Sequence, residues 1–449
     1  MNNFLNYINE NKKKNRPICF LTLNDKLEEQ RLLYTMTQIK DAGFGGVYIH
    51  ARSGYIGGYL EEDWFRSTDI IVDFCEENDM ECWVYDEFGW PSGVAGGITL
   101  EGKEHLCQKW VIKNDTPDYP RGRVLAFYSK DSAVVSKEVA SYSLEVIENR
   151  SYIDVLRREV TNLFIRSTHE RYRERYGNRI KGFFTDEPQF GNNNPAWNDQ
   201  IENYLKDKYE NCLQLLPLLF DGEADSEFRQ TYLKKVSDDF LNNYVGTIAE
   251  WCDTYGYRLT GHFLEEKGLM YQIASCGDMM AMYGKMQCPG MDWLGQEIGD
   301  MAAPKQVSSV CQRYGRQRSV SECFALIGYG ASFDVMKNIV DWEIAGGISN
   351  ICNIVSYSVR GRRKRDYPAG ITLNQPYFDK VKIYNDYISK ISTIVAYLQE
   401  RAEVLLVEPL YGCMKEFAYG KPGKEAVMLN QKYLDTVELL TKRHILYHM

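Results

Sequence analysis

Short apolar segments rich in β-branched and aromatic residues alternate with longer helical stretches from residue 17 to about residue 400. The first segment is residues 17–23. Residues 27–42 then place apolar side chains at three- and four-residue spacing up to Gly43, which predicts a helix with a glycine at its carboxyl end. A strand followed by a helix is the repeating unit of parallel α/β folds. The alternation therefore predicts a fold built from such units.

Eight segments of this kind can be recognised, which is the number of strands that closes a parallel barrel. Such a barrel needs about 250 residues, and a chain of 449 residues can carry one with insertions. The predicted fold class is therefore α/β, a (β/α)8 TIM barrel that forms a catalytic domain over residues 1–402. Its strands are predicted at residues 17–23, 46–50, 81–87, 180–187, 258–262, 290–293, 318–322 and 347–354.

Two regions depart from the strand and helix alternation. Residues 100–150 contain apparent hairpin strands at 123–128 and 134–146, which predicts a small β-rich insertion after the third barrel strand. A helix is predicted over 152–176, before the fourth strand. The apolar run 404–409 follows a predicted helix at 377–401, so residues 403–449 are predicted to begin a second, incomplete α/β domain.

Composition favours a folded enzyme and disfavours several kinds of partner. Acidic residues outnumber basic ones by 62 to 53, and the net charge of −9 argues against nucleic acid as a partner. The basic run 360–365 is short and is interpreted as a solvated loop or one that lines a site. No apolar run is long enough to span a membrane, and residues 1–16 lack a signal-peptide core, so the chain as given is predicted to be cytoplasmic. Its twelve cysteines show no C-x-x-C pair, which favours reduced, buried thiols.

Acidic and aromatic side chains gather at the carboxyl ends of the predicted strands. In parallel barrels the active site lies at that end, so we expect these side chains to converge on one pocket. A sugar ring stacks on an aromatic face while its hydroxyls bond to charged and polar groups, which makes Trp90 and Trp293 candidate platforms. The predicted substrate-binding residues are His50, Arg52, Asp86, Glu87, Trp90, Asp186, His262, Asp292 and Trp293.

Two glutamates are the candidate catalytic pair. Glycoside hydrolysis needs one carboxyl group that donates a proton to the leaving oxygen and a second that acts as base or nucleophile. Glu187 ends the fourth predicted strand and Glu322 ends the seventh, and these strands lie across a barrel from one another. The neighbouring Asp186 is expected to disfavour ionisation of Glu187 and to help it keep its proton.

Several segments resemble glycoside hydrolase family 106, the family of bacterial α-L-rhamnosidases and their relatives. The similar segments are residues 46–52, 59–60, 64–65, 84–93, 95–97, 185–187 and 260–262, of which "YDE…WPSG…AGG" is the most distinctive. The resemblance implies an α-L-rhamnoside-like substrate, an inverting mechanism, the acid role for Glu187 and the base role for Glu322. It also implies a Ca²⁺ ion that helps to hold the sugar hydroxyls, although two-carboxylate chemistry itself requires no cofactor.

Two other functions are compatible with the same residues. A metal-dependent sugar isomerase or hydrolase would use histidine and carboxylate ligands at strand ends. A catalytically inactive, carbohydrate-binding barrel would need only the pocket. The sequence specifies no metal ligand set, glycosidic linkage or oligomeric state. The candidate ligands for the metal-dependent alternative are His50, Asp86, Glu87, Asp186, Glu187 and His262.

Overall fold

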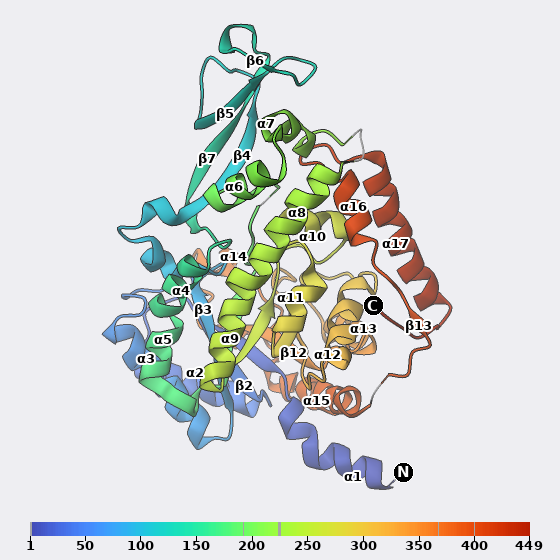
Figure 1. The fold of residues 1–449 in the computed structure, drawn as a ribbon. Helices are drawn as coiled ribbons and strands as arrows, with labels where there is room; N and C mark the ends of the chain where they lie inside the picture. The colour runs from blue at the N-terminus through green and yellow to red at the C-terminus, as the bar shows by residue number, and fades with distance from the viewer. Residues whose placement is uncertain (1, 192, 223–225, 367, 399) are drawn as a thin grey trace.

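Eight parallel strands close into a barrel in the computed structural model, which describes residues 2–191, 193–222, 226–366, 368–398 and 400–449 (Figure 1). β1 pairs with both β2 and β12, which closes the sheet. The predicted (β/α)8 barrel is confirmed. Its strands, in chain order, are β1 (Ile18–Leu23), β2 (Gly46–Ala51), β3 (Glu81–Phe88), β8 (Gly182–Asp186), β9 (Arg258–His262), β10 (Cys288–Trp293), β11 (Val320–Cys323) and β12 (Asn350–Ser356).

Aromatic side chains fill the interior of the barrel. The Phe20 ring packs edge-on against Phe184 and Tyr48, with centroid separations of 4.6 and 5.2 Å. Tyr85 and Trp83 belong to the same buried cluster. Because helices cover the outside of the sheet, the strands are largely buried on both faces, and β1 and β2 are rich in apolar residues. The aromatic layer lies beneath His50 and Asp186, each of which is two residues further along its strand than Tyr48 or Phe184.

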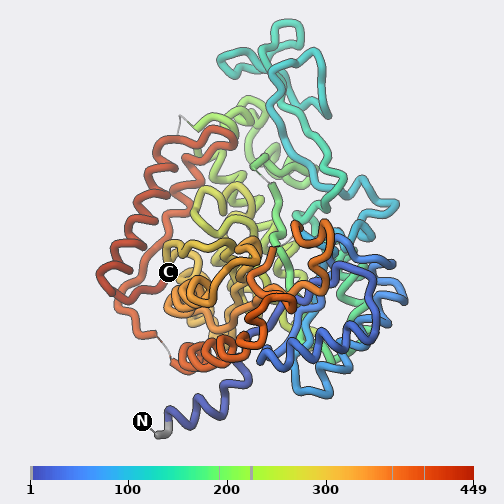
Figure 2. Tube along the Cα trace, turned by 180° about the vertical axis from the view of Figure 1, so that it is seen from behind, coloured from blue at the N-terminus to red at the C-terminus, as the bar shows by residue number. Residues whose placement is uncertain are grey.

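Helices surround the barrel in both views (Figures 1 and 2). The prediction of a single helix over 152–176 is wrong. Strand β7 extends to Ile153, and the helical part that follows is interrupted at Thr168, whose φ of −129° and ψ of −67° are not helical. The surrounding helices are α2 (Glu29–Asp41), α3 (Glu62–Glu77), α4 (Arg158–Ser167), α5 (His169–Tyr176), α8 (Glu227–Phe240), α9 (Gly246–Tyr255), α11 (Met279–Lys285), α12 (Ala302–Arg313), α13 (Phe333–Ala345) and α15 (Val381–Tyr397).

The predicted β-rich insertion is present between β3 and β8. It is a four-stranded antiparallel sheet in the order β4-β7-β5-β6, and it extends away from the barrel in Figures 1 and 2. Its first strand was not predicted. The four strands are β4 (Cys107–Asn114), β5 (Arg123–Tyr128), β6 (Val134–Val135) and β7 (Tyr142–Ile153).

The C-terminal segment lies along one side of the barrel (Figure 2). Helices α16 (Leu410–Glu416) and α17 (Lys424–Lys442) contact α8 and α10 (Leu269–Ser275), and β13 (Val404–Leu405) pairs in parallel with β14 (Tyr447–His448). The buried Arg229 of α8 donates to the Lys415 carbonyl at 2.6 Å. Assignment of residues 403–449 to a second domain stays a prediction. Within the described residues, no helix combines the length and apolar character needed to cross a membrane.

Candidate active site

A cavity of about 340 Å³ lies at the carboxyl-terminal mouth of the barrel. Barrel residues reach it from the ends of β8, β10 and β11, and Arg52 follows the end of β2. Six of the side chains predicted from the sequence line this cavity, including both candidate catalytic glutamates. The lining residues are Arg52, Trp90, Asp186, Glu187, Asp292, Leu294, Glu322, Leu326 and Asp366.

Strand register brings charged residues of neighbouring strands together in pairs. Asp186 of β8 lies beside His262 of β9, and Asp292 of β10 lies beside Glu322 of β11. Glu187 comes directly after β8 and has a φ of 46°, which is uncommon for a residue with a side chain. Such conformations persist only where surrounding contacts hold them, and they concentrate at functional sites. The turn at Glu187 directs the chain away from the strand at the point where its side chain lines the cavity.

His262 connects the two sides of the cluster from just below the cavity. Its Nε2 lies 3.0 Å from Glu322 Oε2 and 3.3 Å from Asp186 Oδ1, and its Nδ1 lies 3.9 Å from Glu266 Oε1. Burial by itself lowers the pKa of His262, but Asp292, Glu322, Asp186 and Glu266 together raise that pKa well above its usual value. The imidazole is therefore a cation held among carboxyl groups.

The carboxyl groups of Asp186 and Glu187 hold protons unusually well. The pKa of Asp186 is raised to about 7 and that of Glu187 to about 8, and burial is the largest cause of both shifts. Asp186 raises the pKa of Glu187 further, whereas His262 lowers both pKa values. The hydroxyl of Tyr85 donates to Asp186 Oδ2 at 2.5 Å. Glu187 thus has the properties of a general acid at neutral pH.

Glu266 and Tyr85 belong to this network and were not predicted. Burial, followed by Asp292, raises the pKa of Glu266 well above its usual value, and burial also raises the pKa of Asp292. A sequence signal for Glu266 was its position four residues after His262. Tyr85 and Asp86 are successive residues of β3, and side chains alternate between the two faces of a strand. Only the location of the barrel interior shows which face carries the site.

The basic run contributes an acid to the cavity. α14 (Arg363–Asp366) follows β12, and the Asp366 carboxylate accepts from Arg52 Nε at 2.9 Å. Arg363 holds this segment in place by donating to the Gly54 carbonyl at 3.0 Å and by pairing with Asp25 at 3.0 Å. The run therefore positions Asp366, the acid that follows it and lines the cavity. Trp90 lies at the rim of the cavity, and 59% of its surface is exposed. From this position the indole ring can stack on a sugar.

Asp86 lies outside the cavity lining and braces the end of β8. Its Oδ1 accepts from Ser92 Oγ at 2.6 Å. Ser92 in turn bonds to the backbone of Asp186 in both directions, because its N–H donates to the Asp186 carbonyl and its Oγ accepts from the Asp186 N–H, each at 2.8 Å. The acid and the serine of the "YDE…WPSG" segment thus fix the strand end that carries Asp186.

Glu87 also lies outside the cavity lining, because its carboxylate binds a turn of its own chain. It accepts from the backbone N–H groups of residues 93–95 at 2.7–3.0 Å, and also from those of Phe88 and Gly96. The pairing of β2 with β3 is irregular here, since Ile49 pairs with Val84 but Ala51 pairs with Phe88. Such a bulge redirects side chains, and a simple strand alternation does not predict it.

His50 and Trp293 also lie outside the cavity lining. His50 is fully buried and stacks on Tyr85 with a centroid separation of 3.7 Å, and burial together with Arg52 lowers its pKa well below the usual value. Trp293 packs against Trp342 at 4.8 Å and donates from Nε1 to the Glu297 carbonyl at 2.6 Å. His50 is therefore a neutral ring beneath the site, and Trp293 lies in the packing between β10 and α13.

Among the residues that the structure describes, two groups of side chains have the geometry to hold a metal ion, and both include His262. Within each group, the candidate ligand atoms lie within 4.8 Å of one another. Ca²⁺ takes six to eight oxygen ligands, so a set of two carboxylates and one imidazole does not fit the calcium ion implied by the resemblance. Histidine and carboxylate donors suit Zn²⁺ and other transition metals better. The groups are Asp186, Glu187 and His262, and His262, Glu266 and Asp292.

The fold and the cavity define a class of molecule: a parallel (β/α)8 barrel with a carboxylate-lined pocket at its carboxyl-terminal mouth. No protein-family model matches the chain, and no curated protein matches it. Solved structures with a similar fold do match it. The rhamnosidase of Novosphingobium sp. PP1Y superposes with a TM-score of 0.65 at 10% identity, over 92% of this chain and 63% of that one. A cold-adapted β-galactosidase of Rahnella sp. R3 superposes with a TM-score of 0.60 at 13% identity, over 97% of this chain and 64% of that one.

These similarities establish a shared fold. This chain spans less than two thirds of the length of either enzyme. At 10% and 13% identity, the site residues must be judged from the geometry of this chain alone.

Replacing Glu87 by Gln is expected to loosen the turn at residues 93–96. The amide cannot accept all of the N–H bonds that the carboxylate accepts, so at least one buried donor loses its partner. We expect the free energy of unfolding to fall by about 1–3 kcal/mol, measured by urea denaturation. Glu77→Gln, on the exposed face of α3, is the matched control and should change it by less than about 0.5 kcal/mol. Equal stability of the two variants would contradict the bracing role of Glu87.

Proposed function

We propose that the protein is a glycoside hydrolase that uses Glu187 as general acid and Glu322 as general base. The observation that carries this proposal is that the two glutamates line one cavity from β8 and β11, and that the pKa of Glu187 is raised to about 8. Glycosidases need one carboxyl group that is protonated at working pH and a second group that acts as base or nucleophile. The cavity supplies both kinds of side chain.

In the proposed reaction, protonated Glu187 transfers its proton to the glycosidic oxygen as the bond between that oxygen and the anomeric carbon breaks. A water molecule attacks the anomeric carbon, and Glu322 takes a proton from it. The products are the free sugar and the released alcohol, and one proton has moved from Glu187 to Glu322. The resemblance in the sequence favours this inverting course, although opposed glutamates are equally a feature of retaining barrels.

The residues around the pair support these two roles. Asp186 raises the pKa of Glu187 and so favours the protonated acid. His262 carries positive charge and contacts Glu322 at 3.0 Å, which orients that carboxylate toward one side of the cavity. We infer that His262 positions Glu322 and balances the negative charge of the cluster, while Arg52, Asp292 and Trp90 contact the sugar.

We infer that the substrate is a terminal 6-deoxyhexoside, similar to an α-L-rhamnoside. The sequence resemblance suggests this class, and the cavity gives it independent support. Leu294 and Leu326 add apolar surface to a lining that otherwise consists mainly of charged side chains. A deoxyhexose presents a methyl group as well as hydroxyls, and the methyl group gains free energy by contact with leucine.

The cluster of Asp186, Glu187 and His262 supports a second candidate function, a metal-dependent sugar isomerase or hydrolase. Of the six ligands predicted for it, these three come together. A panel of aryl glycosides, assayed with and without EDTA, separates the possibilities. We expect cleavage that EDTA leaves largely unchanged, whereas isomerisation abolished by EDTA would favour the metal-dependent enzyme. Sugar binding without turnover would favour an inactive barrel.

Replacing either glutamate by glutamine is expected to lower turnover of an unactivated glycoside by a factor on the order of 10² or more, because each change removes a proton-transfer partner. A nitrophenyl leaving group needs little protonation, so it should partly restore the activity of Glu187→Gln but not that of Glu322→Gln. NMR of the first-formed anomer then reports the stereochemistry. Product with the substrate's anomeric configuration would contradict inversion, and near-normal turnover of a variant would remove that residue from the mechanism.

Replacing Asp186 by Asn is expected to shift the pH profile. Because a general acid must be protonated, wild-type activity should fall as pH rises past about 8, the pKa of Glu187. Asp186 helps to raise that pKa, so its replacement should lower the pKa and move the basic limb of kcat to lower pH. Asp366→Asn removes another acid of the same cavity that is not a main cause of the shift, and it should leave the limb in place. A basic limb unmoved in Asp186→Asn would show that Glu187 does not set it.

A further inference from the structure

The β-rich insertion lies directly against the segment that follows Glu187. Strand β4 pairs with this segment through two backbone bonds, from Val111 N–H to the Pro195 carbonyl at 2.8 Å and from Trp197 N–H to the Lys109 carbonyl at 2.9 Å. An antiparallel bridge joins Trp110 to Ala196. The insertion therefore extends its sheet onto a segment that begins at the candidate acid.

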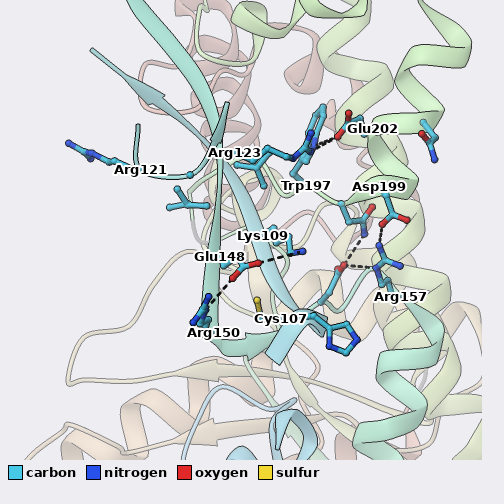
Figure 3. Close-up of a pocket in the computed structure, with 17 residues that line it drawn as sticks. Cys107, Lys109, Arg121, Arg123, Glu148, Arg150, Arg157, Trp197, Asp199 and Glu202 are labelled. Carbon is cyan, nitrogen blue, oxygen red and sulfur yellow. Dashed lines mark hydrogen bonds and ion pairs between the residues drawn. The ribbon is translucent and has the colours of Figure 1, made fainter. Parts of the chain in front are cut away.

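Ion pairs strengthen the boundary between the insertion and this segment (Figure 3). Arg123 of β5 pairs with Glu202 of α6 (Asp199–Lys208) at 2.5 Å, and Trp197 Nε1 donates to the same carboxylate at 3.1 Å. Arg157, which follows β7, pairs with Asp154 at 3.0 Å and also with Asp199. These contacts surround a groove of about 830 Å³ between the sheet and α6. The segment after Glu187 is thus held at its far end by several independent contacts.

The near end of the segment is contacted by a buried glutamine of the insertion. Gln108 of β4 is buried, and its Nε2 donates to the Phe190 carbonyl at 2.7 Å and to the Gln189 carbonyl at 3.2 Å. Its Oε1 accepts from Asn149 Nδ2 at 3.1 Å, so both ends of the carboxamide are bonded. Asn149 belongs to β7, the strand next to β4, and fixes the direction in which the amide points.

Phe190 is anchored from the opposite side as well. Its N–H donates to the Ser275 carbonyl at 3.0 Å, and its ring packs edge-on against Phe240 with a centroid separation of 5.8 Å. The chain between Glu187 and Phe190 is short, and Glu187 has the left-handed φ of 46°. A residue with a side chain holds such a conformation only when its surroundings impose it. The bonds from Gln108 and to Ser275 fix Phe190 three residues after Glu187.

We propose that Gln108 is a positioning residue for Glu187, and that the β-rich insertion serves catalysis by holding the acid in the cavity. The inference rests on the proposed function, since it assigns Gln108 to the proton-donating half of that reaction. Without the two bonds from Gln108, the backbone after Glu187 can relax, and the carboxyl group then spends less time directed at the glycosidic oxygen. Errors in the position of a catalytic group reduce kcat more than substrate binding.

The test compares Gln108→Met with Lys109→Met. Methionine keeps the length of the glutamine side chain and removes both of its donors. Lys109 is the next residue on β4, its side chain pairs with Glu148 instead of the segment after Glu187, and substitution leaves its carbonyl in place. We expect Gln108→Met to lower kcat on an unactivated glycoside on the order of tenfold with KM changed by less than about twofold, whereas a nitrophenyl glycoside should lose much less. Lys109→Met should match the wild type on both substrates.

Hydrogen exchange tests the positioning without any assay of turnover. The backbone amides of Glu187 and of residues 189–191 should exchange faster in Gln108→Met than in Lys109→Met, while peptides from the barrel strands stay protected. An equal loss of kcat on both kinds of glycoside would overturn the proposal, because a misplaced acid must discriminate between leaving groups. Unchanged exchange at residues 187–191 would also overturn it. If the wild type cleaves no glycoside, the proposed function itself fails, and the exchange experiment still decides whether Gln108 holds the segment.

Discussion

The placement of His262 among carboxyl groups is the interaction on which the candidate site depends. Its ring nitrogens lie within 4 Å of Glu322, Asp186 and Glu266, all of which are buried. Several buried carboxylates cannot all be ionised without a compensating charge, and protonated His262 supplies one. The remaining repulsion and the burial appear as raised pKa values, which reach about 7 for Asp186 and about 8 for Glu187. The crowding of buried carboxyl groups lowers the stability of the fold. The same crowding raises the pKa of Glu187, which makes this residue a proton donor.

Two acids predicted from the sequence to bind substrate have a different function in the structure. Asp86 and Glu87 stand next to each other in the most distinctive segment of the chain, yet both bind the backbone or side chains of the turn that follows β3. Asp86 accepts from Ser92, which bonds to the backbone of Asp186, while Glu87 holds the turn at residues 93–96. Their contribution to the cavity is therefore indirect. It keeps the end of β8 in register with β9, where Asp186 meets His262.

Segments outside the barrel strands complete the cavity. The basic run after β12 places Asp366 opposite Arg52, and the turn after β3 places Trp90 at the rim. The β-rich insertion holds the chain that leaves Glu187 through Gln108. A parallel barrel presents strand ends to one side, and the connections between strands decide which of those ends are covered, braced or open. In this molecule the connections after β3, β8 and β12 all serve the same cavity.

The sequence by itself determined the barrel, the insertion and the convergence of Glu187 and Glu322 on one mouth. These features depend on the alternation of strands and helices, and on the rule that parallel strands end on the same side. Tertiary structure decided which neighbouring side chains enter the cavity. The bulge in β3 directs Glu87 away from the cavity, and His50 is buried because it stacks on Tyr85. The short helix α14 directs Asp366 into the cavity. Side-chain direction at a strand end depends on local register and on contacts between segments far apart in the chain, and neither is encoded in the periodicity of a single strand.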